Sequence, residues 1–155
     1  MQYFPIFSIP IGLPLYRLEN GRTMGRQAEY LSAHPDIPAN FFRSDPESAS
    51  AQKIQHQLLV ALTREKKNLF KEFETQPQTE PIILTSLGYV VNGNRRLSTW
   101  RELLESNKQK FDRFRNIEVV ILPYADEKEI DRVEADLQLK EDLKADYSWT
   151  STALM

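Results

Sequence analysis

The residues best suited to chemistry stand together in "GYVVNGNRRLSTWREL", residues 88–103. The apolar run reads as a strand, Gly93 can take the positive φ of a sharp reversal, and an amphipathic helix pattern follows. The start of a helix attracts anions through its backbone N–H groups and its dipole. Arg95 and Arg96 add guanidinium forks that suit phosphate. The stretch therefore predicts a phosphate pocket formed by Gly93, Asn94, Arg95 and Arg96, with Asn94 capping the helix.

The same residues could form a β-hairpin instead of a strand–turn–helix corner. An Asn-Gly pair between apolar strands is a common β-hairpin turn. In a hairpin, Arg95 and Arg96 would be exposed strand residues without a pocket. Spacing alone leaves both interpretations open: a strand–turn–helix corner that holds an anion, or a plain two-stranded ribbon.

Other elements must position this corner. Prolines restrict residues 1–18 to one or two short edge strands, and Ser44 or Asp45 can cap a helix that has Pro46 in its first turn. The apolar run "IEVVILP" is typical of a strand buried on both faces. Together these patterns predict an α+β domain with a small mixed sheet and packed helices. The expected elements are helices over about 23–33, 46–74, 95–114 and 126–144, and strands over 82–84, 88–91 and 117–123.

Composition limits the class of protein. The chain has 155 residues, a net charge of −2 and no cysteine, so disulfides, thiolate nucleophiles and Cys-based zinc sites are excluded. It reads as a single domain over residues 1–155. No apolar stretch is long enough to span a bilayer and no signal peptide is evident, so we expect a cytoplasmic protein without a membrane partner. The apolar ending "SWTSTALM" lacks a helix-stop signal, which predicts a longer parent chain.

The corner and its flanks resemble the N-terminal domain of ParB proteins, within the ParB/sulfiredoxin-like superfamily. The resemblance covers about residues 54–143. In that family a "q-P-I-x-V" strand leads into a "G-y-x-v-x-G-x-R-R" turn and a helix, and an "E-N-L-Q-R-E-D-L" segment follows downstream. The matching residues are Gln78, Pro81, Ile82, Leu84, Gly88, Val90, Gly93, Arg95, Arg96, Leu137, Gln138, Glu141, Asp142 and Leu143.

This resemblance implies a ParB/sulfiredoxin-like fold that binds a nucleoside triphosphate, CTP or ATP, with Mg²⁺. Its phosphates would lie at Gly93–Arg96, approached by Gln138 and by Arg22, whose segment "YRLENGRT" stands where the family has its early "N-P-R". Glu134 and Asp136 are the implied metal ligands and catalytic carboxylates. Such domains act as switches in DNA-associated processes such as plasmid or chromosome partition, phage function and defence. The implied partners are the nucleotide, DNA bound directly or through another domain, and a second copy of the chain.

The sequence also departs from the family pattern. Ala135 stands where ParB has a carboxylate, Asp136 where it has Asn, and Leu139 where it has Arg. These changes place nucleotide hydrolysis in question. The sulfiredoxin branch is excluded, because Asn94 occupies the position of its catalytic cysteine and the sulfur chemistry needs a thiol.

Two other functions stay open. Some relatives are metal-dependent nucleases, and the acidic last helix could hold a divalent metal against a DNA phosphate. The domain could instead be an interaction module with a degenerate pocket. Two basic stretches, "REKK" at residues 64–67 and "NKQKFDRFR" at 107–115, read as solvated helix faces or as contacts to a phosphate backbone. His34 and His56, the two histidines, read as packing or surface residues.

Overall fold

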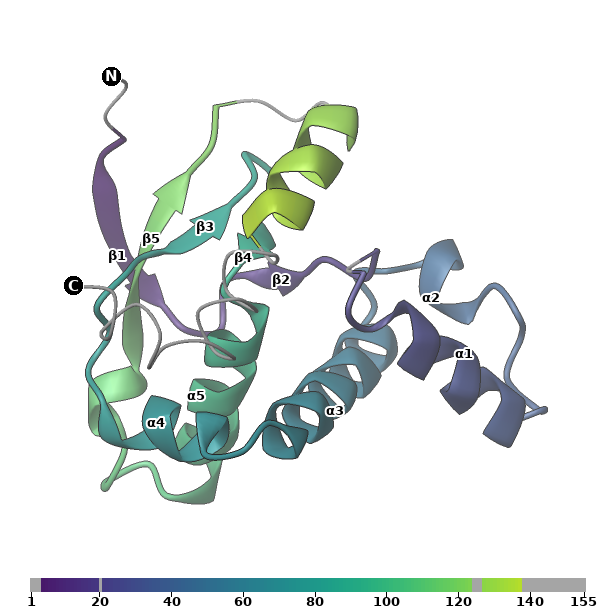
Figure 1. Ribbon diagram of the computed structural model, residues 1–155, viewed down its shortest axis with the longest axis horizontal. Coiled ribbons are helices and arrows are strands. Elements are labelled where there is room, and N and C mark those ends of the chain that lie inside the picture. Colours follow the sequence, from purple (N-terminus) through teal and green to yellow (C-terminus); the bar gives the residue numbers. More distant parts are fainter. Residues whose placement is uncertain (1–3, 20, 124–126, 138–155) are drawn as a thin grey trace, which may run out of the picture.

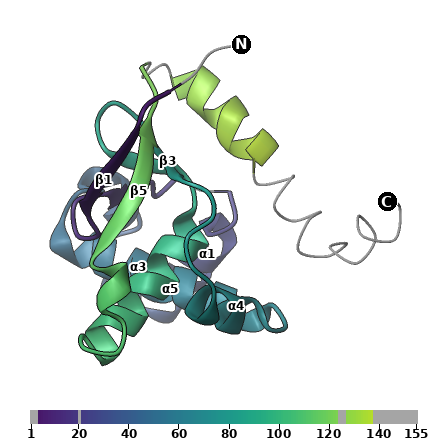
Figure 2. The same ribbon diagram turned by 90° about the vertical axis from the view of Figure 1, so that its left-hand side faces the viewer.

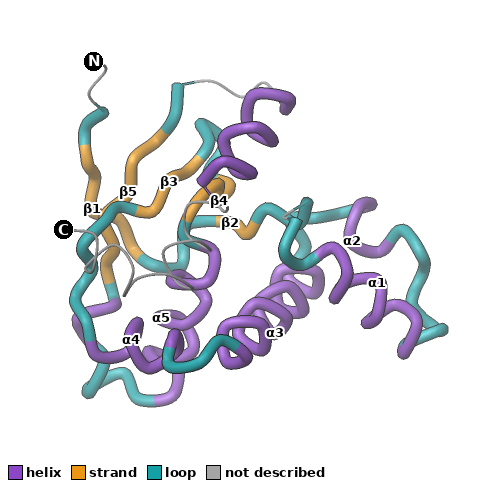
Figure 3. Tube along the Cα trace, in the orientation of Figure 1, coloured by secondary structure: helices purple, strands orange, loops and turns teal. Residues whose placement is uncertain are grey.

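The structure is a computed structural model that describes residues 4–19, 21–123 and 127–137. These residues form an α+β domain with a five-stranded mixed sheet and packed helices (Figures 1 and 3), which confirms the predicted fold class. Residues 127–137 are also helical and are called the 127–137 helix below. The named elements are β1 (Ile6–Pro10), β2 (Leu15–Tyr16), α1 (Met24–Ala33), α2 (Phe41–Ser44), α3 (Ala49–Glu65), α4 (Leu69–Thr75), β3 (Ile82–Leu84), β4 (Tyr89–Asn92), α5 (Asn94–Ser106), the 3₁₀ turn η1 (Asp112–Phe114) and β5 (Asn116–Ile121).

The sheet has the strand order β1-β5-β3-β4-β2. Within it β1 is antiparallel to β5, β5 is parallel to β3, β3 is antiparallel to β4, and β4 is parallel to β2. The two N-terminal strands therefore form the two edges of the sheet, as their prolines predicted. The strands that carry the Gly93 corner lie inside it.

Alternation along the strands sends neighbouring side chains to opposite faces of the sheet. Ile82, Leu84 and Val90 join the main core, which includes Leu59 of α3 and Leu97 of α5. The other face carries a smaller apolar cluster. Figure 2 shows α3, α4 and α5 grouped at one end of the molecule and the 127–137 helix at the other.

The 127–137 helix packs on that other face through a small apolar cluster. Ile130 of the helix is buried with Val91 of β4 and Leu122, and Ile83 and Val133 pack against them. The helix predicted from about residue 126 is confirmed over residues 127–137, where Ile130 is buried and Val133 and Leu137 are half-buried. Residues 138–144 of the predicted helix, Gln138 among them, lie outside the described residues.

The long helix expected over 46–74 is in fact two helices. Asn68 adopts a left-handed conformation with φ of 67° between α3 and α4, and Asn tolerates that region better than most residues. The apolar spacing continues across this break, which is why periodicity missed it. The start was also wrong: Ser48 caps α3 by accepting a hydrogen bond from the backbone N–H of Ala51 at 3.1 Å.

Two further boundaries differ from expectation. Helix α5 ends at Ser106, well before the predicted 114, because Asn107 is extended and its side chain accepts from the N–H of Lys110 at 3.0 Å to form a turn. Strand β5 is not buried on both faces throughout, since Glu118 is exposed between buried Ile117 and Val119. No helix in the described part of the chain is both long and apolar enough to cross a membrane.

Candidate functional site

The Gly93 corner is a strand–turn–helix corner, so the hairpin alternative is wrong. β4 ends at Asn92, Gly93 has φ of 107°, and α5 begins at Asn94. A Cβ atom on Gly93 would lie 2.3 Å from Cδ1 of Ile82, so both the backbone angle and the packing require glycine. The helix cap is Gly93, with Asn94 the first helical residue; the expectation that Asn94 caps the helix was off by one position.

The two arginines of the corner have different surroundings. Arg96 is half-buried and donates to the carbonyl oxygens of Glu80 at 2.7 Å and Pro81 at 3.5 Å, and to Oδ1 of Asn92 at 3.3 Å. Its guanidinium thus ties the start of α5 to the segment before β3. Arg95 is 5% exposed, and its carbonyl oxygen accepts from the Ser98 and Thr99 hydroxyls, each at 2.9 Å.

Asn94 completes the corner with a buried polar atom. The residue is 3% exposed, and its Oδ1 accepts no hydrogen bond from the residues that the structure describes. Burying an amide oxygen without a donor is unfavourable. Oδ1 of Asn94 therefore keeps an acceptor position for a hydrogen-bond donor.

A second group of charged residues surrounds Arg17, which directly follows β2. Tyr16 turns into the main core, so strand alternation sends Arg17 to the face that carries the 127–137 helix. On that helix Glu127, Asp131 and Glu134 share one side, at spacings of four and three residues. Arg17 Nη2 lies 3.3 Å from Glu127 Oε2 and also pairs with Asp131, and its Nη1 lies 3.0 Å from Glu134 Oε1. We call these four residues the Arg17 cluster.

Charge and burial are coupled within the Arg17 cluster. Burial would lower the pKa of Arg17, but its carboxylate partners, Asp131 first, hold that pKa above the ordinary value. Burial raises the pKa of Glu134 to about 7, against the opposing effect of Arg17 and of the nearby Arg22. Glu134 is 4% exposed, and its Oε2 accepts no hydrogen bond from the described residues. Burial thus makes the Glu134 carboxyl harder to ionise than an exposed one, and Arg17 offsets part of this effect.

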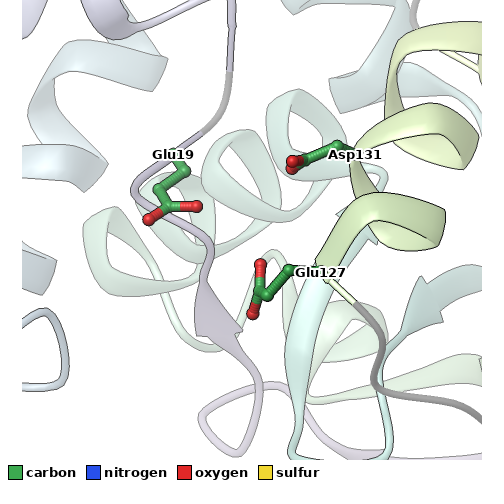
Figure 4. Close-up of side chains that lie close together, drawn as sticks. All are labelled: Glu19, Glu127 and Asp131. Carbon is green, nitrogen blue, oxygen red and sulfur yellow. The ribbon is translucent and has the colours of Figure 1, made fainter.

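Three exposed carboxylates converge beside Arg17. One oxygen from each of Glu19, Glu127 and Asp131 lies within 4.8 Å of the other two. Figure 4 shows Glu19 on the segment after β2 and the other two on the 127–137 helix, with their carboxylates around a common space. Arg17 Nη2 also lies 3.6 Å from Glu19 Oε2, so a guanidinium already offsets part of the negative charge of these three carboxylates.

A pocket of about 990 Å³ opens next to these carboxylates. Its walls come from the segment after β2, α1, α2, the β3–β4 turn and the 127–137 helix. Arg17, Glu127 and Asp131 contribute to its lining, together with apolar residues such as Met24 and Leu87. None of the four corner residues, 93–96, is part of that lining.

The predicted metal ligands do not lie together. Glu134 is buried beside Arg17, whereas Asp136, two residues further along the helix, is exposed. Two residues correspond to about 200° of helical rotation, so the two carboxylates face opposite sides. Of the predicted site residues, the structure brings Arg22 and Glu134 into electrostatic contact and groups residues 93–96 at one helix start.

Sequence reasoning missed Arg17. Its signal was a single arginine within the apolar run "LPLYRL", where an edge strand would otherwise place another hydrophobic residue. Such a charge is expected to have partners once buried.

Comparisons of this chain with models of protein families, with curated proteins and with solved structures found no match.

Proposed function

We propose that this domain binds a nucleoside triphosphate, CTP or ATP, and acts as a ParB-like switch in a DNA-associated process. The observation that carries this is the start of α5. The helix begins directly after a left-handed glycine that has no side chain to cap it, and Arg95 and Arg96 stand in its first turn. Helix N–H groups and guanidinium groups together favour the phosphates of a nucleotide.

A second observation supports a switch. Val91 lies two residues before Gly93 and packs against Ile130 and Val133 of the 127–137 helix. An anion that moves the corner would therefore also move the surface on which this helix rests. The helix is attached by a small apolar cluster and by the Arg17 cluster, and we propose that binding at the corner changes its position. Its release would support the contact between two copies implied by the ParB resemblance.

Magnesium is part of the proposal, and of its two implied ligands Glu134 is the one with an oxygen to offer: its Oε1 pairs with Arg17 at 3.0 Å, which leaves Oε2. The buried Oε2 of Glu134 accepts no hydrogen bond from the described residues, and carboxylate oxygen is a ligand that Mg²⁺ accepts. When bound, the ion would neutralise phosphate charge. Asp136 faces away from Glu134, so one ion cannot take both carboxylates from this helix.

The nuclease alternative has weaker support. It needs carboxylates that converge on one metal ion next to the corner arginines. The carboxylates that do converge are Glu19, Glu127 and Asp131, and they surround the guanidinium of Arg17, whose charge stands where a metal would have to bind. We therefore place nuclease activity second to nucleotide binding.

The test is equilibrium binding of labelled CTP, ATP and GTP, each with and without Mg²⁺. We expect saturable, magnesium-dependent binding of CTP or ATP. Arg96→Ala should weaken it by roughly 1.5–3 kcal/mol, the value of a hydrogen bond to a charged group. Because Arg96 also bonds to the carbonyls of Glu80 and Pro81, the thermal melt of the variant is measured first.

Two further variants sharpen this test. Arg95→Lys keeps the charge but loses the guanidinium fork, so it should also weaken binding. Arg132→Ala removes an exposed arginine from the 127–137 helix and should bind as the wild type does. No saturable binding of any nucleotide would reduce the domain to an interaction module, and DNA cleavage without nucleotide binding would favour the nuclease.

A further inference from the structure

The fold brings together two basic segments that are far apart in the sequence. Residues 64–71 run from the end of α3 into α4, and residues 108–115 follow α5 and include η1. Figures 1 and 2 both place these segments at the end of the molecule that lies away from the 127–137 helix. We call their exposed cationic residues the basic surface: Arg64, Lys66, Lys67, Lys71, Lys108, Lys110, Arg113 and Arg115.

Specific contacts join the elements that carry the two segments, α4 on one side and α5 with η1 on the other. Arg113 donates to the carbonyl oxygen of Glu74 at the end of α4, and Trp100 of α5 donates to the carbonyl oxygen of Phe73 at 3.2 Å. The guanidinium of Arg64 lies 4.0 Å from the ring centroid of Phe70, which links the end of α3 to α4. The basic surface is therefore held together by tertiary structure.

Charge is strongly segregated in this chain. Residues 64–71 and 108–115 contain eight of the 20 Lys and Arg residues but two of the 22 Asp and Glu residues, which gives +6. The rest of the chain carries −8. Both acids inside the segments are already paired, Glu65 with Arg26 and Asp112 with Arg115 at 2.9 Å. Glu72, Glu74 and Glu105 border the surface and set its limits.

Two arginines of the basic surface are held over aromatic rings. Arg64 stacks on Phe70, and the guanidinium of Arg113 lies 4.3 Å from the ring centroid of Phe114. Side chains held in this way lose less conformational entropy when they bind a ligand. Phe111 and Phe114 themselves are buried, at 5% and 4% exposure, so they offer no ring for stacking on bases.

We propose that the basic surface binds the sugar–phosphate backbone of duplex nucleic acid without sequence preference. Clustered lysines and arginines with little opposing charge match a regular row of phosphates. The burial of Phe111 and Phe114 removes the stacking platform that single-strand binders use. This surface is separate from the Gly93 corner, so the inference does not depend on nucleotide binding.

The test measures binding to two 20-base-pair DNA duplexes of unrelated sequence, with the single strand and heparin for comparison, over a series of salt concentrations. We expect equal affinity for both duplexes and weaker binding to the single strand. Affinity should fall steeply with salt, because each phosphate contact contributes about −0.9 to the slope of log K against log salt.

Matched double variants locate the surface. Lys108→Ala/Lys110→Ala and Lys67→Ala/Lys71→Ala should each weaken duplex binding by about tenfold at low salt and reduce the slope by up to about two. Lys53→Ala/Arg132→Ala removes two exposed charges elsewhere and should change binding much less. Thermal melts check that each variant is folded.

Three results would overturn the inference. The first is no saturable duplex binding at low salt. The second is an equal loss of duplex affinity in the control variant and in both surface variants. The third is binding of heparin but not of duplex DNA, which would assign the surface to a different polyanion. Nucleotide binding is measured with labelled nucleotides and with the Arg95 and Arg96 variants. The two proposals can therefore fail independently.

Discussion

Nη1 of Arg17 lies 3.0 Å from Oε1 of Glu134, and both side chains are almost fully buried, at 7% and 6% exposure. The first residue follows an edge strand and the second lies on the 127–137 helix, 117 positions later in the chain. Of the ion pairs that Arg17 makes with this helix, the pair with Glu134 is the most buried, because Glu127 and Asp131 are exposed. We therefore expect this ion pair to contribute to the pH dependence of stability and to the attachment of the helix.

Glu134 should make the domain less stable as the pH rises. Its pKa is raised from 4.5 to about 7 in the folded state, so the folded protein binds the proton more tightly than the unfolded chain. The free energy of unfolding should therefore be highest below pH 4.5 for this group and fall as the pH rises toward 7, by roughly 3 kcal/mol in all. Urea titrations of the wild type and Glu134→Gln across this range measure it. The variant should show a flatter dependence, and parallel curves would contradict the prediction.

Arg17→Met should loosen the 127–137 helix before it unfolds the domain. The substitution leaves the buried Glu134 and its neighbours without their cation, and removing one member of a buried pair costs about 3–5 kcal/mol. Hydrogen exchange should accelerate at least about 100-fold in this helix and much less in α5.

The control for this prediction is Arg132→Met, an exposed arginine on the same helix, which should leave exchange unchanged. The double variant Arg17→Met/Glu134→Gln should recover part of the protection, because no carboxylate charge then remains buried at that position. Equal acceleration in every helix would mean that Arg17 stabilises the whole fold rather than this one attachment.

Gly93→Ala should destabilise the corner through two effects. The new Cβ would lie 2.3 Å from Cδ1 of Ile82, and φ of 107° is strained for any residue with a side chain. We expect a loss of at least about 2 kcal/mol in chemical denaturation, since each effect costs on the order of 1–3 kcal/mol.

Two substitutions separate the causes. Ile82→Val removes the Cδ1 atom, so adding it to Gly93→Ala should relieve the close contact but not the backbone strain. Gly25→Ala in α1 meets no atom within 4 Å and should stabilise the protein by up to about 1 kcal/mol. If the Gly93→Ala variant is as stable as the wild type, the contact between residue 93 and Ile82 is less tight than in this structure.

Tyr16 should resist ionisation in alkali. Burial raises its pKa to about 12, against the opposing effect of Arg101, and its hydroxyl lies 2.7 Å from Nδ1 of His56. The folded state thus disfavours the phenolate, and stability should fall between pH 10 and 12. Tyr16→Phe removes the hydrogen bond and should cost about 1 kcal/mol at neutral pH. The tyrosinate absorbance of the wild type and of Tyr16→Phe should differ by one group that ionises near pH 12. A difference that appears near pH 10 would contradict the burial of the Tyr16 hydroxyl.

Local pattern in the sequence determined much of the corner. Asn92-Gly93 predicted a reversal, and the helix pattern after it was found in α5, because these signals depend on near neighbours in the chain. The edge positions of β1 and β2 followed in the same way from their prolines. The break at Asn68 was not predicted, because the apolar spacing continues from α3 into α4. A single residue with a left-handed φ does not change that spacing.

Tertiary structure decided which charges meet. Nothing local to Arg17 shows that it contacts Glu134, and nothing local to Glu134 and Asp136 shows which of them is buried. The same holds for the basic surface, whose two segments are separated by more than 30 residues. Charge pairing depends on distance in space, and that distance is set by how the sheet orders its strands and where the helices pack on it.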